Sequence, residues 1–219
     1  MIRDKIQTEE YFQEAFEWYS KCLQEDIERF DKVKPENISS HFRFRVIDYE
    51  DLLRVGYSLG KDVRDLFPYY QGILSSLKEV ASEGVPFYRA VDVFALGVLY
   101  SDRKEEFLDD LKAIYAQMDH TDGLIEYYMT YLFHDMVVPF HSILEYQNMI
   151  EDTYDSVAKA QGFWYYSHSD APWYNNYTKD TYVGYWSFDT AATCKIKGIF
   201  DERLKDLEYF PYDLLVQEN

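Results

Sequence analysis

Cysteine is scarce in this sequence, and segments typical of secreted or membrane proteins are missing. The 219 residues include two cysteines, Cys22 and Cys194, which are far apart and in no spacing typical of a metal or redox site. So few thiols are typical of a reducing compartment, and the first residues, MIRDKIQTEEYF, contain no apolar segment of a signal peptide. No apolar run approaches the ~20 residues of a membrane-spanning helix. We therefore expect a cytoplasmic protein that does not enter a membrane.

Phosphate-binding loops and strand signals are also lacking. Only 9 glycines are present, and none forms the Gly-rich loop that cradles phosphates. The one strand candidate is HFRFRVI, residues 41–47. Elsewhere apolar residues recur at steps of three and four, which is the period of a helix. The sequence predicts an all-α fold, an irregular multi-helix bundle of antiparallel helical hairpins with at most a minor strand.

Apolar periodicity and the positions of Pro and Gly predict the helices one by one. They are residues 8–32, 49–80 with a kink or break at Pro68, 87–100, 104–118, 123–133, 142–160 and 185–199. Residues 161–182 are expected to form an ordered loop with helical turns, and the tail around Pro211 to be extended. We predict a single helical domain over residues 1–219, with an N-terminal part of about 1–135 and a C-terminal part of about 140–219.

Basic residues are strongly outnumbered. The chain has 40 acidic and 22 basic residues, which gives a net charge of -18. Residues 1–110 hold 23 acidic and 15 basic residues, and residues 111–219 hold 17 and 7, so the excess belongs to the whole folded surface. Such a surface repels nucleic acid and anionic membranes and attracts a basic protein. Acidity can also serve solubility alone, so the charge by itself does not decide between these two interpretations.

Patterns typical of catalytic or metal sites are missing. The 5 His include no HExxH pair, and Pro139 separates His134 from His141. No nucleophile elbow is present. Acidic residues four apart could ligate metals, but no Glu-x-x-His accompanies them. We expect no catalytic residue, no metal and no cofactor.

Acidic residues on two predicted helices are the candidate contacts for a basic partner. They are Glu105, Glu106, Asp109 and Asp110 on the helix over 104–118, and Glu145, Glu151, Asp152 and Asp155 on the helix over 142–160.

The C-terminal stretch carries a resemblance to a known family. Residues 182–215 read YVGYWSFDTAATCKIKGIFDERLKDLEYFPYDLL. The GYWSFD run and the YFPYDL tail resemble the PoNi family, the immunity proteins of polymorphic nuclease toxins of the PoNe type. The spacing of Trp164, His168 and Trp173 and the start RDKIQTEEYF, residues 3–12, are similar as well. Asp189, where Glu is usual, and Phe210, where Tyr is usual, are mild departures.

The resemblance implies an all-helical protein that binds and neutralises a cognate DNase toxin and has no catalytic residues. We expect its motif residues to hold the fold: Gly184 lets the chain turn, Ser187 and Asp189 cap a helix start, and the bulky aromatics pack inward. Trp164, Trp173 and Trp186 could also form a recognition surface, but we favour the core. The motif residues are Trp164, His168, Trp173, Gly184, Tyr185, Trp186, Ser187, Phe188, Asp189, Tyr209, Pro211 and Asp213.

The hypothesis from sequence is an immunity protein whose acidic surface covers the phosphate-binding surface of a nuclease toxin, or binds beside its active site. The partner is then a basic protein, with no direct contact to nucleic acid. Two alternatives stay open, a helical scaffold or adaptor that binds peptides and a metal-dependent helical hydrolase. The sequence predicts no oligomeric state.

Overall fold

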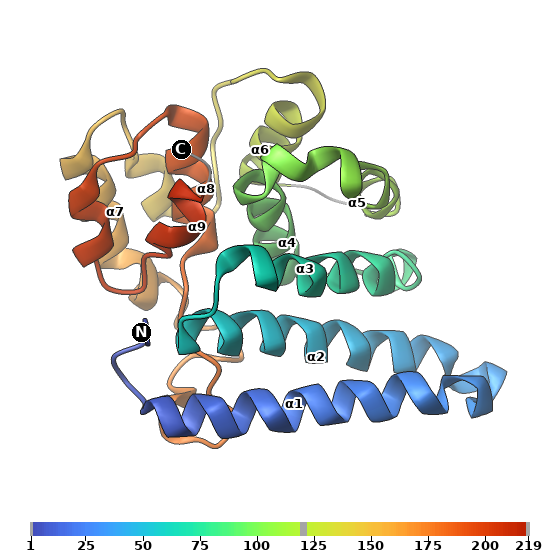
Figure 1. Ribbon diagram of the computed structural model, residues 1–219. Coiled ribbons are helices and arrows are strands. Elements are labelled where there is room, and N and C mark those ends of the chain that lie inside the picture. The colour runs from blue at the N-terminus through green and yellow to red at the C-terminus, as the bar shows by residue number, and fades with distance from the viewer. Residues whose placement is uncertain (1, 119–121, 218–219) are drawn as a thin grey trace. The chain divides into compact units, whose positions relative to one another are not determined.

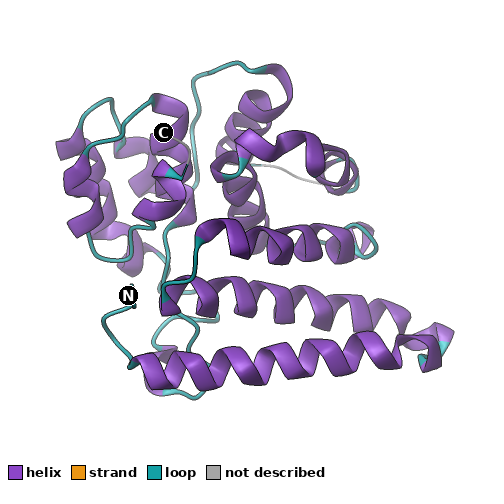
Figure 2. Cartoon of the chain, viewed as in Figure 1, coloured by secondary structure: helices purple, strands orange, loops and turns teal. Residues whose placement is uncertain are grey.

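Helices and the turns between them make up the structure, a computed structural model that describes residues 2–118 and 122–217. Helices α1 to α9 and short 3-10 helices follow one another, and no strand occurs in these residues (Figure 2). The predicted all-α class and multi-helix bundle are confirmed. The strand candidate at residues 41–47 is wrong, because this segment lies inside α2. No helix of the described ranges is both long and apolar enough to cross a membrane.

The chain forms two compact units. Unit 1 comprises the described residues within 1–84, 109–118 and 176–185, and unit 2 those within 85–108, 119–175 and 186–219. Each unit is therefore assembled from segments that are distant in sequence. The prediction that residues 1–219 fold as one domain is a statement about independent folding, and it stays a prediction.

Three long helices form most of unit 1 (Figure 1). They are α1 (Glu9–Arg29), α2 (Ile38–Leu59) and α3 (Val63–Leu77), and α2 packs against both of the others. The side chain of Thr8 caps α1, as predicted, by accepting a hydrogen bond from the backbone N–H of Tyr11 at 3.2 Å. Short 3-10 helices flank these elements at Phe30–Lys32, Pro35–Asn37 and Ala81–Glu83.

The break between α2 and α3 lies at Gly60 and not at Pro68, so the predicted helix over 49–80 is wrong in both its start and its break. Gly60 ends α2 in the left-handed conformation, with φ 90°. Asp62 then caps α3 by accepting a hydrogen bond from the N–H of Arg64 at 2.9 Å. Pro68 stays inside α3. Most of α3 is buried, and this packing outweighs the one backbone hydrogen bond that a proline removes.

The N-terminal residues of unit 1 are tied to residues 176–185 through a buried carboxylate. The Tyr182 hydroxyl donates to Asp4 Oδ2 at 2.7 Å, and both side chains are buried. Asp4 Oδ1 also accepts the backbone N–H of Ile6 at 2.7 Å. The Tyr11 hydroxyl donates to the carbonyl of Tyr182 at 2.8 Å. The start of the chain and a segment some 170 residues later thus stabilise each other.

We predict that Tyr182→Phe lowers the free energy of unfolding by about 1–3 kcal/mol, because Asp4 would keep its buried charge and lose a donor. Urea unfolding followed by circular dichroism measures the difference. Tyr177→Phe, at an exposed position of the same segment, is the control and should change the stability by less than about 0.5 kcal/mol. Equal stability of both variants would contradict the role given to Asp4.

The apolar helix α4 (Phe87–Leu99) lies at the centre of unit 2. It packs against α6 (Gly123–His134) and α8 (Phe188–Lys197). Every residue from Ala90 to Leu99 except Asp92 is buried, so this helix is apolar nearly all round, as expected for a core helix. The remaining α-helices of unit 2 are α7 (Tyr154–Ser167) and α9 (Tyr212–Val216).

Two helices begin later than predicted. A 3-10 helix over Ser101–Glu106 precedes α5 (Leu108–Tyr115), where we predicted one α-helix over 104–118. The helix predicted over 142–160 is instead a 3-10 helix, Glu145–Met149, followed by α7. The Thr153 side chain fixes the start of α7 by accepting the backbone N–H of Ser156 at 3.3 Å.

The C-terminal third contains helices that the sequence placed differently. Residues 161–167, predicted as loop, are the end of α7, and 3-10 turns follow at Asn176–Thr178. The last long helix begins at Phe188 rather than at residue 185. The tail is helical from Tyr212 and not extended, because proline suits the position just before a helix. A further 3-10 helix spans Glu202–Asp206.

Candidate protein-binding site

The GYWSFD motif places a buried carboxylate in the core of unit 2. Asp189, on the first turn of α8, is 2% exposed. Its Oδ1 accepts the indole N–H of Trp164 at 3.1 Å, and its Oδ2 accepts the amide of Gln147 at 2.9 Å and the hydroxyl of Tyr146. The backbone carbonyl of Asp189 accepts the Tyr128 hydroxyl at 2.8 Å. One residue thus joins α8 to α6, α7 and the 3-10 helix Glu145–Met149.

Neither polar residue of the motif caps α8 as we expected. Ser187 precedes the helix, but its side chain makes no capping hydrogen bond. Its hydroxyl donates to Gln161 Oε1 at 2.9 Å, and its backbone N–H donates to the carbonyl of Tyr209 at 2.9 Å. The carboxylate of Asp189 is directed into the core. The motif therefore connects α8 to α7 and to the C-terminal tail rather than finishing a helix end.

His168 lies within a cluster of aromatic rings. Its Nδ1–H donates to the carbonyl of Trp164 at 2.7 Å. The rings of Tyr88, Tyr146, Trp164 and Trp173 have centroids 5.0, 5.7, 4.9 and 5.3 Å from the His168 ring. Trp164 and Trp173 stack at 5.4 Å. Trp164 and Trp186 are buried and Trp173 is half-buried.

The remaining motif residues shape the chain at its turns. Gly184 has a φ of 103°, which favours glycine. Tyr185 and Phe188 are buried, and so is Pro211, which precedes α9. Asp213 is exposed on the first turn of α9.

We predict that Asp189→Asn lowers the free energy of unfolding by about 2–3 kcal/mol, since an amide nitrogen would face groups that donate hydrogen bonds. Urea unfolding at neutral pH measures the change. Asp206→Asn, an exposed position of the same unit, serves as the control and should be neutral within about 0.5 kcal/mol. If Asp189→Asn is also neutral, the carboxylate does not organise this core.

The first group of predicted contact acids does not share one helix. Glu105 and Glu106 belong to the 3-10 helix, and Asp109 and Asp110 to α5. Two of the four are in ion pairs: Glu106 with Arg103 at 2.8 Å and Asp110 with Lys78 at 2.7 Å. The hydrogen bond from Arg103 lowers the pKa of Glu106. Glu105 and Asp109 are exposed.

The second group of predicted contact acids gathers at the start of α7. Glu151 and Asp152 precede this helix, Asp155 lies in its first turn, and all three are exposed. The backbone N–H of Glu151 donates to Ser156 Oγ at 3.0 Å, which holds the segment against the helix. Asp152 forms an ion pair with Lys197, 3.0 Å apart. Glu145, exposed in its 3-10 helix, lies on a separate element, because the predicted common helix does not form.

Exposed aromatic side chains are the feature that the sequence analysis missed. On α7 they are Phe163, 48% exposed, and Tyr166, 70% exposed. The most exposed ones of unit 1 are Trp18 of α1, 64% exposed, and Phe44 of α2, 66% exposed. Trp18 lies off the apolar stripe of its helix, a signal that the sequence contains. The aromatics of α7 could be assigned to a face only once the start of that helix was known.

Asp48 and Asp51 follow the exposed Phe44 along α2. The Cys22 thiol of α1, one turn after Trp18, has a raised pKa, first through burial and then through the charge of Asp48. Further along α2, the carboxyl group of Asp51 forms a hydrogen bond with the hydroxyl of Tyr19.

Burial raises the pKa of Asp51 to about 7. The charges of Glu50 and Asp48 contribute to this rise, and Arg54 and the hydrogen bond from Tyr19 counteract part of it. The folded chain therefore keeps this proton at pH values where the unfolded chain has released it.

We predict that the contribution of Asp51 to stability is full below about pH 4 and is lost as the pH rises through about 7, because the raised pKa belongs to the folded state. The Asp51→Asn side chain cannot ionise. Between pH 5 and pH 8, the free energy of unfolding of Asp51→Asn should therefore rise relative to that of the wild type by on the order of 2 kcal/mol. Urea unfolding at both pH values checks this. The exposed Asp31→Asn should show no such gain; a pH-independent difference for Asp51→Asn would refute the assignment.

No three His, Cys, Asp or Glu side chains come together as a metal-holding group within residues 2–118 and 122–217. The described chain is an all-helical, strongly acidic protein with exposed acids and aromatics on helix surfaces, a combination suited to binding another protein.

Comparison with known families identifies the chain. Residues 3–111 match the family described as "PoNe immunity protein (PoNi), N-terminal", and residues 126–214 match "PoNe immunity proteins (PoNi), C-terminal". The chain therefore belongs to the PoNi family, and the resemblance seen at its two ends extends through the middle. No curated protein and no solved structure was found to match the chain.

Proposed function

We propose that this protein binds its cognate PoNe nuclease toxin and neutralises it in the cytoplasm of a bacterial cell, without catalysing a reaction. The observation that carries the proposal is the match of both parts of the chain to PoNe immunity proteins. A single family thus accounts for nearly all of the described residues of both units.

The acidity of the chain supports a mechanism of inhibition by charge and bulk. A nuclease grips phosphates with basic residues. A protein with a net charge of -18 is electrostatically complementary to such a surface and excludes DNA from it. Binding beside the active site is the alternative geometry, and a toxin that still binds DNA in the complex would favour it.

Among the predicted contact acids, we place the first contact at Glu151, Asp152 and Asp155. These three are exposed and adjacent, and they lie at one helix end. Glu145, Glu105 and Asp109 are exposed on other elements, whereas Glu106 and Asp110 are engaged in ion pairs. Asp152 is paired too, with Lys197, but its side chain is 84% exposed, against 47% for Glu106 and 35% for Asp110, so a basic partner can replace this ion pair at a smaller loss.

The proposed function is tested by co-expression. Cells that express the nuclease toxin should grow only when this protein is produced with it, and a purified inactive toxin should retain the protein on a column. A toxin that kills as before and does not bind would refute the proposal. A stoichiometric tightly bound metal ion with hydrolytic turnover would instead support the alternative of an enzyme.

We predict that the double variant Glu151→Lys/Asp155→Lys slows association with the toxin about tenfold or more at low salt, because steering by charge acts mainly on the association rate. Stopped-flow or biolayer interferometry at two salt concentrations measures it. Asp31→Lys/Glu36→Lys makes the same change of charge at exposed positions of unit 1 and is the matched control. Equal rates for the two variants would show that only net charge matters.

A further inference from the structure

The second half of helix α7 carries apolar residues on both its inner and its outer side. Its inner side is buried through Val157, Ala160 and Trp164. Its outer side carries Phe163 and Tyr166, which are one turn apart and 48% and 70% exposed. A helix at the surface of a soluble protein normally presents polar residues to water. The outer side of α7 therefore has a composition typical of a surface that another protein covers.

Gly162 lies on the same outer side, one turn before Tyr166. A Cβ atom added at this position would meet no atom within 4 Å, and the backbone there is ordinary helix. Nothing in the chain thus requires glycine, although glycine in a helix interior is unfavourable compared with alanine. Gly162 therefore leaves open space beside the two exposed aromatics, where a partner's side chain can approach the helix.

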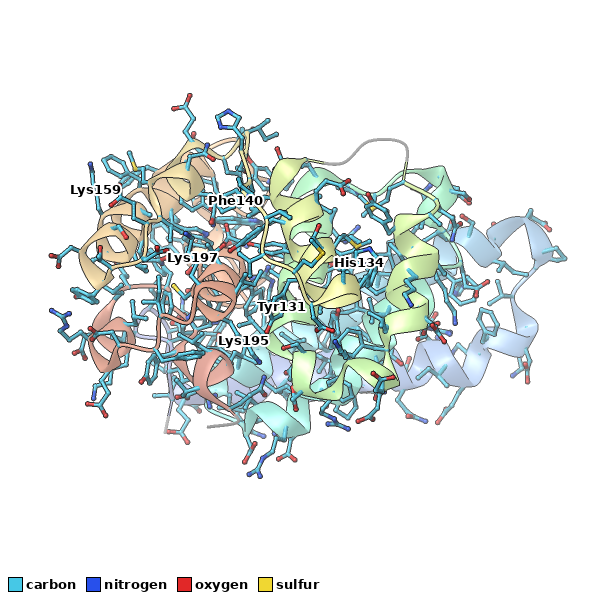
Figure 3. All side chains as sticks on the ribbon, turned by 90° about the horizontal axis from the view of Figure 1, so that it is seen from above. Tyr131, His134, Phe140, Lys159, Lys195 and Lys197 are labelled. Carbon is cyan, nitrogen blue, oxygen red and sulfur yellow. The ribbon has the colours of Figure 1, made fainter. Side chains whose placement is uncertain are left out.

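The charge of this helix is complementary to a basic partner at one end. Glu151, Asp152 and Asp155 lie at its start. Lys159, the one basic residue of α7, follows Asp155 by one turn and is exposed on the outer margin of the helix (Figure 3). Lys197, in contrast, is engaged with Asp152. Arg203, which is paired with Asp201, lies over the ring of Tyr154 at this end as well. The three acids outnumber the exposed cations Lys159 and Arg203 by one, and this small excess adds to the net charge of -18 of the chain in attracting basic side chains.

We propose that the outer side of α7, with Phe163 and Tyr166 beside Gly162, is the apolar anchor that holds the cognate nuclease toxin after the acids at the helix start have attracted it. The proposal rests on the proposed function and adds which surface of the chain determines the lifetime of the complex. Aromatic residues dominate the energetics of protein interfaces, whereas surrounding charges mainly set the rate of encounter. The anchor is therefore expected to act on the dissociation rate.

The first test compares two exposed aromatic pairs. We expect Phe163→Ala/Tyr166→Ala to raise the Kd for a purified, catalytically inactive cognate toxin tenfold or more, mainly through faster dissociation. Trp18→Ala/Phe44→Ala removes a pair of similar exposure from unit 1 and should change the Kd less than threefold. Loss of binding in the unit 1 variant alone would overturn the proposal.

The second test uses substitutions that keep both aromatics. Gly162→Leu places a bulky side chain in the open space beside the two aromatics, so the variant should unfold no earlier than the wild type and yet bind at least tenfold more weakly. Lys159→Glu removes the cation of the face and should accelerate association severalfold, whereas Lys21→Glu on α1 should do so less. Unchanged binding by Gly162→Leu together with equal effects of the two lysine variants would overturn the proposal.

The outcomes separate the inference from the function on which it rests. If wild type binds the toxin and the α7 variants bind equally well, the function stands and this surface is wrong. If wild type does not bind, both fail. Sedimentation of the free wild type adds one more outcome: a dimer that the α7 variants dissociate would assign the face to a second copy of this chain and overturn the proposal.

Discussion

A carboxyl group enclosed in the core of unit 2 is the constraint on which the arrangement of its helices depends. A buried carboxylate is tolerated only when hydrogen-bond donors surround it. Asp189 meets this condition through Trp164, Gln147 and Tyr146, which come from α7 and the 3-10 helix before it. Each donor must stay in place for the charge to be solvated. The carboxylate therefore fixes the rotation of α7 about its own axis, and with it the side that α7 turns to water.

Unit 1 uses the same physical device with different residues. Asp4 is buried, and its donors are the Tyr182 hydroxyl and backbone N–H groups near the N-terminus. In both units a carboxylate near a chain-end motif is satisfied by groups distant in sequence. The recognisable motifs of the family thus act on the inside of each unit. The chemistry of these motifs says how the fold is held, and it leaves the exposed helix faces available for partners.

The sequence predicts an element correctly where a single local preference, such as helix capping or apolar periodicity, determines the structure. Thr8 starts α1 as a capping residue, and the apolar run of residues 87–100 forms a core helix. Predictions are wrong where a local preference conflicts with tertiary packing or with hydrogen bonds that the sequence pattern does not reveal. Pro68 does not break α3, because burial of that helix outweighs one hydrogen bond. Residues 142–153 were read as helix from their periodicity, whereas hydrogen bonds between Ser142 and Asn148 close a loop there.

For a related reason, the sequence predicts the acidic residues of the candidate site but not its exposed aromatic residues. Charge can be counted from composition, so Glu151 and Asp155 could be proposed as contacts without knowing their neighbours. Exposure cannot be counted in this way. Phe163 and Trp164 are adjacent and both aromatic, yet one is exposed and the other is buried. Only the correct start of α7, at Thr153, tells the two apart.

This difference between charge and exposure bears on how an immunity protein could choose one toxin. An acidic surface attracts any basic protein, and attraction at long range falls with salt. With a net charge of -18 spread over both units, charge alone cannot distinguish one nuclease from another. Discrimination requires contacts that fit one partner and fail with others, and exposed apolar side chains can make such contacts. In the proposed complex the exposed aromatics beside Gly162 supply them, and the acids at the start of α7 attract the partner.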